Sequence, residues 1–303
     1  MEYERHEFTQ PLYGGVNVLR IGDTLVDTGH VAPVCRDAVR EALDGPLSGV
    51  EQVLHTHAHI DHVGGSQTID ALAELPHVVP EGQPEFLYDY ASYLRRAREE
   101  MTRLLAGFDP DPSTWDTYFP IREYAEDAID VTRTVGDGDT VEMGDEAFVA
   151  VSTPGHADPH LAFHHEPSGT VLSGDLVDPD GRFQYGPLLG DIGNYKDSLR
   201  RLRDLDPDRL VPMHGPELSN PRERIDGSLS NAERTEARLL SFLEEREACF
   251  AREFVTDELG VGGARTPFLT LVVYEYCRYL EDRGELSVDV TSEGIRLRPL
   301  EVE

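Results

Sequence analysis

The run from Thr56 to His62 limits what this chain can fold into, because it places three histidines and an aspartate within six consecutive positions. Imidazole nitrogens and carboxylate oxygens are the usual protein ligands of divalent transition metals. At the end of an extended strand, His57 and His59 point to the same side, and a tight turn can bring Asp61 and His62 back toward them. One metal cannot comfortably use all four side chains, so the run indicates two adjacent metals.

Three further motifs follow the first run along the chain: Thr153-Pro154-Gly155-His156, Ser173-Gly174-Asp175 and Met213-His214-Gly215. In this order and spacing, the four motifs resemble those of the metallo-β-lactamase-fold hydrolases, in the branch of glyoxalase II and the β-lactamase-like endoribonucleases. A histidine-rich surface loop would explain the first motif but not its partners. The resemblance implies an α/β fold, an αββα sandwich of two facing β-sheets with helices outside.

The resemblance also implies how the side chains divide between two metals. It assigns three imidazoles to a first metal, three side chains to a second and one carboxylate that bridges both: His57, His59 and His156; Asp61, His62 and His214; and Asp175. The implied cofactors are two zinc ions, with manganese or iron as alternatives at the more oxygen-rich second site. A metal-bridged hydroxide would attack the substrate, with Asp61 and Asp175 as the catalytic carboxylates.

Other residues are expected to act beside this ligand set. Asp27, at the end of a predicted strand, should support the metal-binding histidines, and His160 should be a hydrogen-bond partner of the site rather than a ligand. Tyr185 is a candidate contact for the substrate oxygen. His55 is expected in the core of the strand that leads into the first motif.

Apolar periodicity and turn residues predict the elements that carry the motifs. A hairpin is expected over 16–27, turning at Gly22-Asp23. The predicted strands are 50–56, 131–135, 139–143, 147–152, 161–164, 170–173 and 209–212, and the predicted helices are 33–43, 66–75, 84–106 and 194–205. Residues 1–219 are therefore interpreted as a catalytic domain with a helical, aromatic-rich insertion at about 82–128. The insertion either packs a small core of its own or covers the site.

The remaining residues, 220–303, are interpreted as a C-terminal domain. Helices are predicted over 231–250, 255–259 and 268–280, and a hairpin over 286–290 and 294–297. This layout resembles the winged helix of the endoribonuclease subgroup. Because the segment has no basic stripe that would neutralise phosphates, we favour a tail that packs on the catalytic domain or on a second copy of the chain.

The charge and composition of the chain further restrict the classes of partner that it can bind. The chain has 58 acidic and 27 basic residues, a net charge of -31, and its single lysine is Lys196. Such a composition resembles proteins of salt-in halophiles, where molar salt screens self-repulsion; an ordinary acidic enzyme is the alternative. Three scattered cysteines and the absence of an apolar run of about 18 residues predict a soluble cytoplasmic protein without a membrane partner.

These observations predict a hydroxyacylglutathione-hydrolase-like enzyme that acts on a small ester, thioester or lactone. The alternative is a metal-dependent endoribonuclease whose C-terminal domain presents RNA to the metals. Single-iron dioxygenases and flavodiiron oxidoreductases are disfavoured, because Asp61, His62 and His214 complete a second site and no flavin domain is evident.

Overall fold

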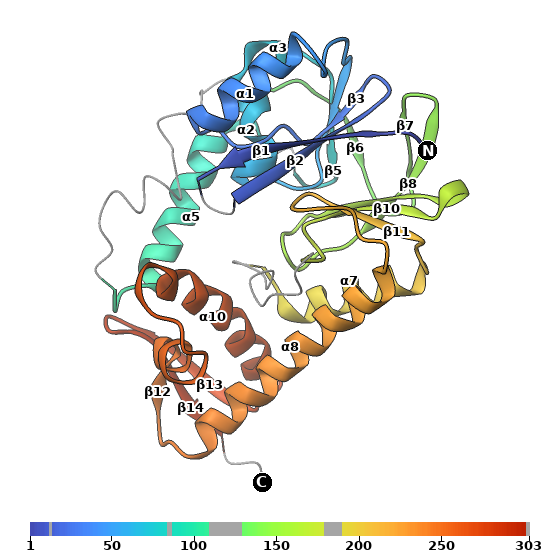
Figure 1. Ribbon diagram of the computed structural model, residues 1–303. Coiled ribbons are helices and arrows are strands. Elements are labelled where there is room, and N and C mark those ends of the chain that lie inside the picture. The colour runs from blue at the N-terminus through green and yellow to red at the C-terminus, as the bar shows by residue number, and fades with distance from the viewer. Residues whose placement is uncertain (12–13, 84–86, 109–128, 179–189, 301–303) are drawn as a thin grey trace.

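The computed structural model describes residues 1–11, 14–83, 87–108, 129–178 and 190–300. Two β-sheets lie face to face in the upper part of Figure 1. The first sheet has six strands in chain order, of which the last four are parallel: β1 (Glu4–Gln10), β2 (Gly14–Ile21), β3 (Thr24–Val26), β4 (Gln52–Leu54), β5 (His77–Pro80) and β6 (Val131–Val135).

The second sheet has five strands in reverse order, and only its β10–β11 pair is parallel. Its strands are β11 (Arg209–Pro212), β10 (Thr170–Gly174), β9 (Leu161–His165), β8 (Glu146–Ser152) and β7 (Thr140–Met143), with a 3-10 turn, η2 (Glu166–Ser168), between β9 and β10. Side chains such as Ile21, Leu54, Phe148 and Phe163 alternate inward from both sheets and form a buried core between them.

Helices cover the outer faces of both sheets, which confirms the predicted αββα sandwich. The first sheet is covered by α1 (Pro33–Leu43), α2 (Ile60–Thr68) and α3 (Asp70–Ala73), and the second by α7 (Ile192–Asp204). Buried residues of α1 pack on strands of the first sheet, and Leu199 and Leu202 of α7 pack with residues of the second. Helix α1 has the predicted bounds.

The structure corrects the prediction around the first motif. Asp61 and His62 do not lie in a tight turn, because α2 begins at Ile60 and places them in its first helical turn. The expected turn glycines, Gly64 and Gly65, lie inside α2. A Cβ at either position would collide with the backbone of the segment 28–31, so these glycines let the helix pack directly against that segment.

Two strands of the first sheet were missed by the prediction. Strand β1 is a sheet edge whose side chains are largely exposed, so its sequence shows little apolar alternation. Strand β5 is four residues long and fully buried, too short for a periodic pattern. The helical insertion contains α5 (Tyr90–Leu104). The aromatic residues predicted within 109–128, and Tyr185, lie outside the described residues.

The C-terminal region combines helices with a small sheet. It contains α8 (Pro221–Glu244), α9 (Ala251–Glu253), a π-helical turn η4 (Phe254–Glu258), a 3-10 turn η5 (Gly263–Arg265) and α10 (Thr266–Asp282), followed by the hairpin β13 (Leu286–Thr291) and β14 (Gly294–Pro299). The predicted helix 231–250 is wrong at both ends. It begins at Pro221, a residue suited to a first helical turn, and Cys249–Phe250 form β12, which pairs with β14.

The C-terminal region shares one hydrophobic core with the rest of the chain. Buried side chains of α5, α7, α8 and α10 belong to the same cluster, including Leu94, Leu199, Leu239 and Val272. In Figure 1, α5 and α7 both reach from the sandwich toward these C-terminal helices. The boundary near residue 220 stays a prediction, but the region is packed onto the sandwich.

Two smaller observations concern the described part of the chain. Within it, no helix combines the length and the apolar character needed to cross a bilayer. Cys35, Cys249 and Cys277 are buried and free of disulfide bonds, as expected for inert thiols.

Candidate metal centre

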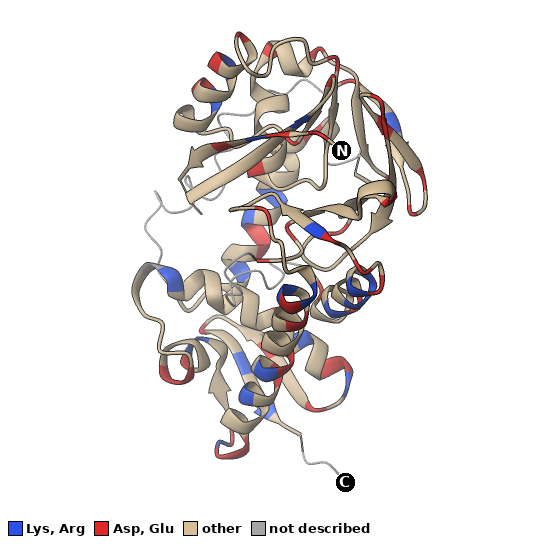
Figure 2. Cartoon of the chain, turned by 45° about the vertical axis from the view of Figure 1, so that its right-hand side comes forward, with Lys and Arg blue, Asp and Glu red and all other residues tan. Residues whose placement is uncertain are grey.

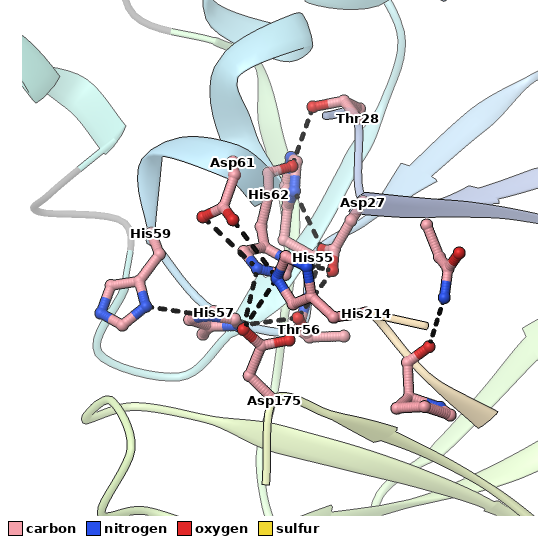
Figure 3. Close-up of polar contacts among 12 residues, drawn as sticks. Asp27, Thr28, His55, Thr56, His57, His59, Asp61, His62, Asp175 and His214 are labelled. Carbon is pink, nitrogen blue, oxygen red and sulfur yellow. Dashed lines mark hydrogen bonds and ion pairs between the residues drawn. The ribbon is translucent and has the colours of Figure 1, made fainter. Parts of the chain in front are cut away.

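The predicted ligands come from four separate segments that meet at one edge of the sandwich. His57 follows β4, His59 precedes α2, and Asp61 and His62 lie in its first turn. The other three ligands follow strands of the second sheet: His156 after β8, Asp175 after β10 and His214 after β11. Figure 3 shows Asp175 rising from below toward side chains that the first sheet supplies from above.

Three imidazoles form the first group. Nδ1 of His59 lies 3.1 Å from Nε2 of His57 and 3.0 Å from Nε2 of His156. These three nitrogens lie within 4.8 Å of one another. Facing lone pairs at this spacing match the donor set of a divalent ion bound by three histidines.

The second group joins two imidazoles and a carboxylate. Nε2 of His214 lies 3.3 Å from Oδ2 of Asp61, and Nε2 of His62 lies 3.6 Å from Oδ1 of the same residue. One ligand atom from each of these side chains fits within 4.8 Å of the other two. This group contains more oxygen than the first.

Asp175 lies between the two groups. Its Oδ2 is 3.6 Å from Nε2 of His156 in the first group, and 3.3 and 3.2 Å from Nε2 of His62 and His214 in the second. Its Oδ1 is buried and has no hydrogen-bond partner among the described residues. An unsatisfied buried carboxylate oxygen is costly, and a pair of cations would satisfy it. The residues therefore fit two adjacent divalent metals.

Buried hydrogen bonds orient the ligands of the second group. Nδ1 of His62 donates to Oδ2 of Asp27 over 2.8 Å, and Nδ1 of His214 donates to the Gly15 carbonyl over 2.6 Å. Gln10 donates from Nε2 to Oδ2 of Asp61 over 3.1 Å. Because Nδ1 donates in both histidines, Nε2 is the nitrogen that each turns toward the centre and that can bind a metal. Asp27 thus lies where the sequence predicted.

The first group is oriented by different contacts. Nδ1 of His57 lies 2.9 Å from the hydroxyl of Thr56, which itself donates to Asp27. The hydroxyl of Tyr90, from the insertion, donates over 2.6 Å to the carbonyl of Ala58. Tyr90 therefore fixes the backbone between two ligands, His57 and His59.

His160 occupies the supporting position predicted for it. Its Nδ1 lies 2.7 Å from the hydroxyl of Thr153, and its Nε2 accepts the backbone N–H of Asp175 over 3.1 Å. Both ring nitrogens are engaged by the protein, so His160 holds the backbone of the bridging residue.

The pKa values divide the histidines into two kinds. Burial lowers the pKa of His57 and His156 well below the ordinary value, and that of His59 as well, which favours the neutral ligand form. Burial opposes protonation in the second group too, but nearby carboxylates outweigh it. Asp175 and Asp61 raise the pKa of His62 well above its usual range and that of His214 to about 10.

The two carboxylates of the centre show the reverse effect. Burial tends to raise the pKa of each, but the neighbouring imidazoles outweigh it. His214 and His62 hold the pKa of Asp175 well below its usual range, and His62 and His214 lower that of Asp61. Both are therefore ionised at neutral pH, as charge compensation for two dications requires.

Sequence reasoning missed three contributors to the centre. Tyr90 and Gln10 form hydrogen bonds that join distant segments, and nothing in their local sequence indicates this. His77 is buried and stacks on His55 with ring centroids 5.4 Å apart. Nδ1 of His55 in turn lies 3.7 Å from Oδ1 of Asp27, so the pair extends the buried polar contacts behind His62.

The chain matches known proteins over this same region. Residues 14–214 match the family model described as the metallo-beta-lactamase superfamily. A curated relative, "Probable metallo-hydrolase YqjP" of Bacillus subtilis, is 28% identical over 67% of this chain and 67% of its own length. "Thioesterase pkgB" of Emericella nidulans is 25% identical over 76% of this chain but only 54% of its own.

Solved structures match over nearly the whole chain. A metallo-beta-lactamase family protein from Thermus thermophilus has a TM-score of 0.76 at 21% identity and covers 98% of both chains. A beta-lactamase domain protein from Burkholderia ambifaria has a TM-score of 0.76 at 20% identity and covers 98% of this chain and 91% of its own. At this level of identity the likeness establishes the fold, including the C-terminal region.

Proposed function

The chain belongs to the metallo-beta-lactamase superfamily, and we propose that it is a binuclear metal-dependent hydrolase that acts on a small ester, thioester or lactone. One observation carries the proposal: Oδ2 of Asp175 lies within 3.2–3.6 Å of imidazoles from both ligand groups. A carboxylate in that position can bridge two metals, which an imidazole cannot do. Zinc is the metal we propose for both positions.

The charged side chains of the centre, and the positions they occupy, support metal-dependent hydrolysis. Bound dications would supply Lewis acidity and make a shared water more acidic. Asp175 brings negative charge to both groups and Asp61 to the second. Oδ2 of Asp61 is held by Gln10 and faces His214, and Oδ1 faces His62; in the proposed reaction this carboxylate would accept a proton from the attacking water. The imidazoles of His59, His156 and His214 border the more open side of the centre.

The thioester part of the proposal has support from one relative. The Emericella nidulans protein bears the name thioesterase. This chain covers little more than half of that protein, so the name suggests a substrate class to test first. A small-molecule substrate also agrees with the net charge of -31, because a strongly acidic surface repels nucleic-acid phosphates at low salt.

The endoribonuclease alternative depends on a basic C-terminal surface. Figure 2 shows basic residues interleaved with acidic ones on the C-terminal helices. Several of these arginines lie in ion pairs with carboxylates: Arg238 with Glu258, Arg278 with Glu275 and Arg283 with Glu285. Arginines held in this way are less available to phosphates, so we favour the small-molecule substrate.

A substrate panel separates the two functions. Zinc-loaded protein is assayed on a thioester, a lactone, a simple ester, a phosphodiester and RNA, with Asp61→Ala as the matched control. We expect hydrolysis of at least one of the first three, lost in the control and after chelation. Specific RNA cleavage at the working salt, absent in Asp61→Ala, would favour the alternative instead.

A further inference from the structure

Helix α7 holds the loop that carries His156. The hydroxyl of Ser198 donates over 2.7 Å to the Pro154 carbonyl, and the backbone N–H of Asp191, which caps α7, donates over 3.0 Å to the Gly155 carbonyl. Gly155 has φ +129° and lies so close to Tyr195 that a Cβ would collide with its backbone. The two residues before His156 are therefore fixed by α7.

The C-terminal region contacts helix α7 as well. Nζ of Lys196, on α7, lies 2.5 Å from Oε1 of Glu236 on α8 and 3.9 Å from the ring centroid of Tyr279 on α10. The ring of Tyr279 also packs on Gly193, where a Cβ would lie 3.1 Å from it. A salt bridge and a cation–π contact thus join α7 to two C-terminal helices.

Lys196 is unusual in this chain. It is the single lysine among 303 residues, and its side chain is only 5% exposed. A buried ammonium loses its hydration and is retained only with a close partner. Glu236 and Tyr279 supply that partner at the junction between the sandwich and the C-terminal helices.

We propose that Lys196 is a positioning residue, through which the packing of the C-terminal helices holds α7 and thereby keeps His156 in place in the first ligand group. This inference rests on the proposed metal centre. Among the described residues, the contacts that hold the second group come from elsewhere, since His62 is held by Asp27 and His214 by the Gly15 carbonyl. The C-terminal region therefore serves one metal position more than the other.

Thermodynamic linkage makes the coupling reciprocal. If the contact of Lys196 favours the geometry of His156 that binds metal, then metal bound through His156 must stabilise the contact of Lys196. The buried amine would then be exposed less often to an amine reagent in solution. Because the chain has one lysine, its modification can be followed without ambiguity.

The experiment measures reductive methylation of Lys196 by mass spectrometry in metal-free and zinc-loaded protein, with the N-terminal amine as internal reference. We expect zinc to slow methylation of Lys196 about tenfold relative to the reference. His156→Ala should remove this protection while His214→Ala keeps most of it. Two zinc ions bound without any protection, or equal protection in both variants, would overturn the inference alone. Failure to bind zinc would overturn the proposed metal centre as well.

Variants of the contact provide a second measurement. Lys196→Met should weaken zinc binding by the first group about tenfold in chelator competition and leave the second group unchanged, and Lys196→Arg should restore most of the loss. Arg200→Met is the matched control, because Arg200 also lies on α7 and pairs with Asp197 and with Glu233 of α8, but its side chain is 41% exposed, and an exposed ion pair contributes little. Equal weakening of both groups by Lys196→Met would contradict a specific role for Lys196.

Discussion

The two ligand groups have similar size but depend on different parts of the molecule. The second group, Asp61, His62 and His214, is held by side chains and carbonyls of the first sheet and its edges. The first group, His57, His59 and His156, depends in addition on Tyr90 of the insertion and on α7. Among the described residues, the contacts that orient the second group thus come from the first sheet and its edges, while those that orient the first group also come from α5 and α7.

The largest effect should come from the residue that both groups share. Asp175→Ala should abolish hydrolysis and weaken metal binding by both groups, because it removes the carboxylate between them. The fold should survive, which circular dichroism would verify. His160→Ala should lower activity by only about 10–100-fold, as for other partners of metal ligands. Equal losses in the two variants would show that His160 acts directly.

A pair of substitutions should separate the groups. Asp27→Asn should weaken metal binding by the second group by about 10–100-fold and by the first group less, because its carboxylate accepts the His62 proton directly but reaches His57 only through Thr56. Tyr90→Phe should weaken the first group by a smaller factor, since it deletes one hydrogen bond to the Ala58 carbonyl. Chelator competition with cobalt-loaded protein would measure each affinity. The distinction between the groups fails if both variants weaken the same one.

Proton release should differ between the groups as well. The pKa of His214 is raised to about 10, so this imidazole is protonated in the metal-free protein at pH 8, and the pKa of His62 is shifted in the same direction. Metal binding by the second group must displace these protons, so its affinity should rise with pH until the pH passes 10. The first group has lowered pKa values and should release none. Calorimetry of His156→Ala and His214→Ala in buffers of different ionisation enthalpy would compare them.

The difference between local motifs and long-range contacts explains which features the sequence could predict. The seven candidate ligands were predicted from the resemblance of four short motifs to a known family, and the helix 33–43 and the strands 131–135 and 209–212 have the predicted bounds. Tyr90, Gln10 and Lys196 act across the fold, through contacts with residues 32, 51 and 40 positions away. No periodic pattern in the sequence encodes such contacts. The residues that orient the metal ligands from a distance are therefore visible only in the structure.

Salt should affect the surface and spare the centre. Lowering KCl from molar to about 0.1 M lengthens the Debye length from about 3 Å to about 10 Å, and repulsion among the excess carboxylates should lower Tm by several degrees. The relative affinities of the two groups should stay constant, because their contacts are buried. Thermal melts and chelator titrations over the same salt series would test both parts. An unchanged Tm would contradict the adaptation to high salt.

Metal content tests the binuclear centre most directly. Elemental analysis of protein purified under mild conditions should give close to two metal ions per chain, with activity that rises until the second is bound. A reproducible value near one ion per chain, at full activity, would contradict the assignment of two ligand groups bridged by Asp175.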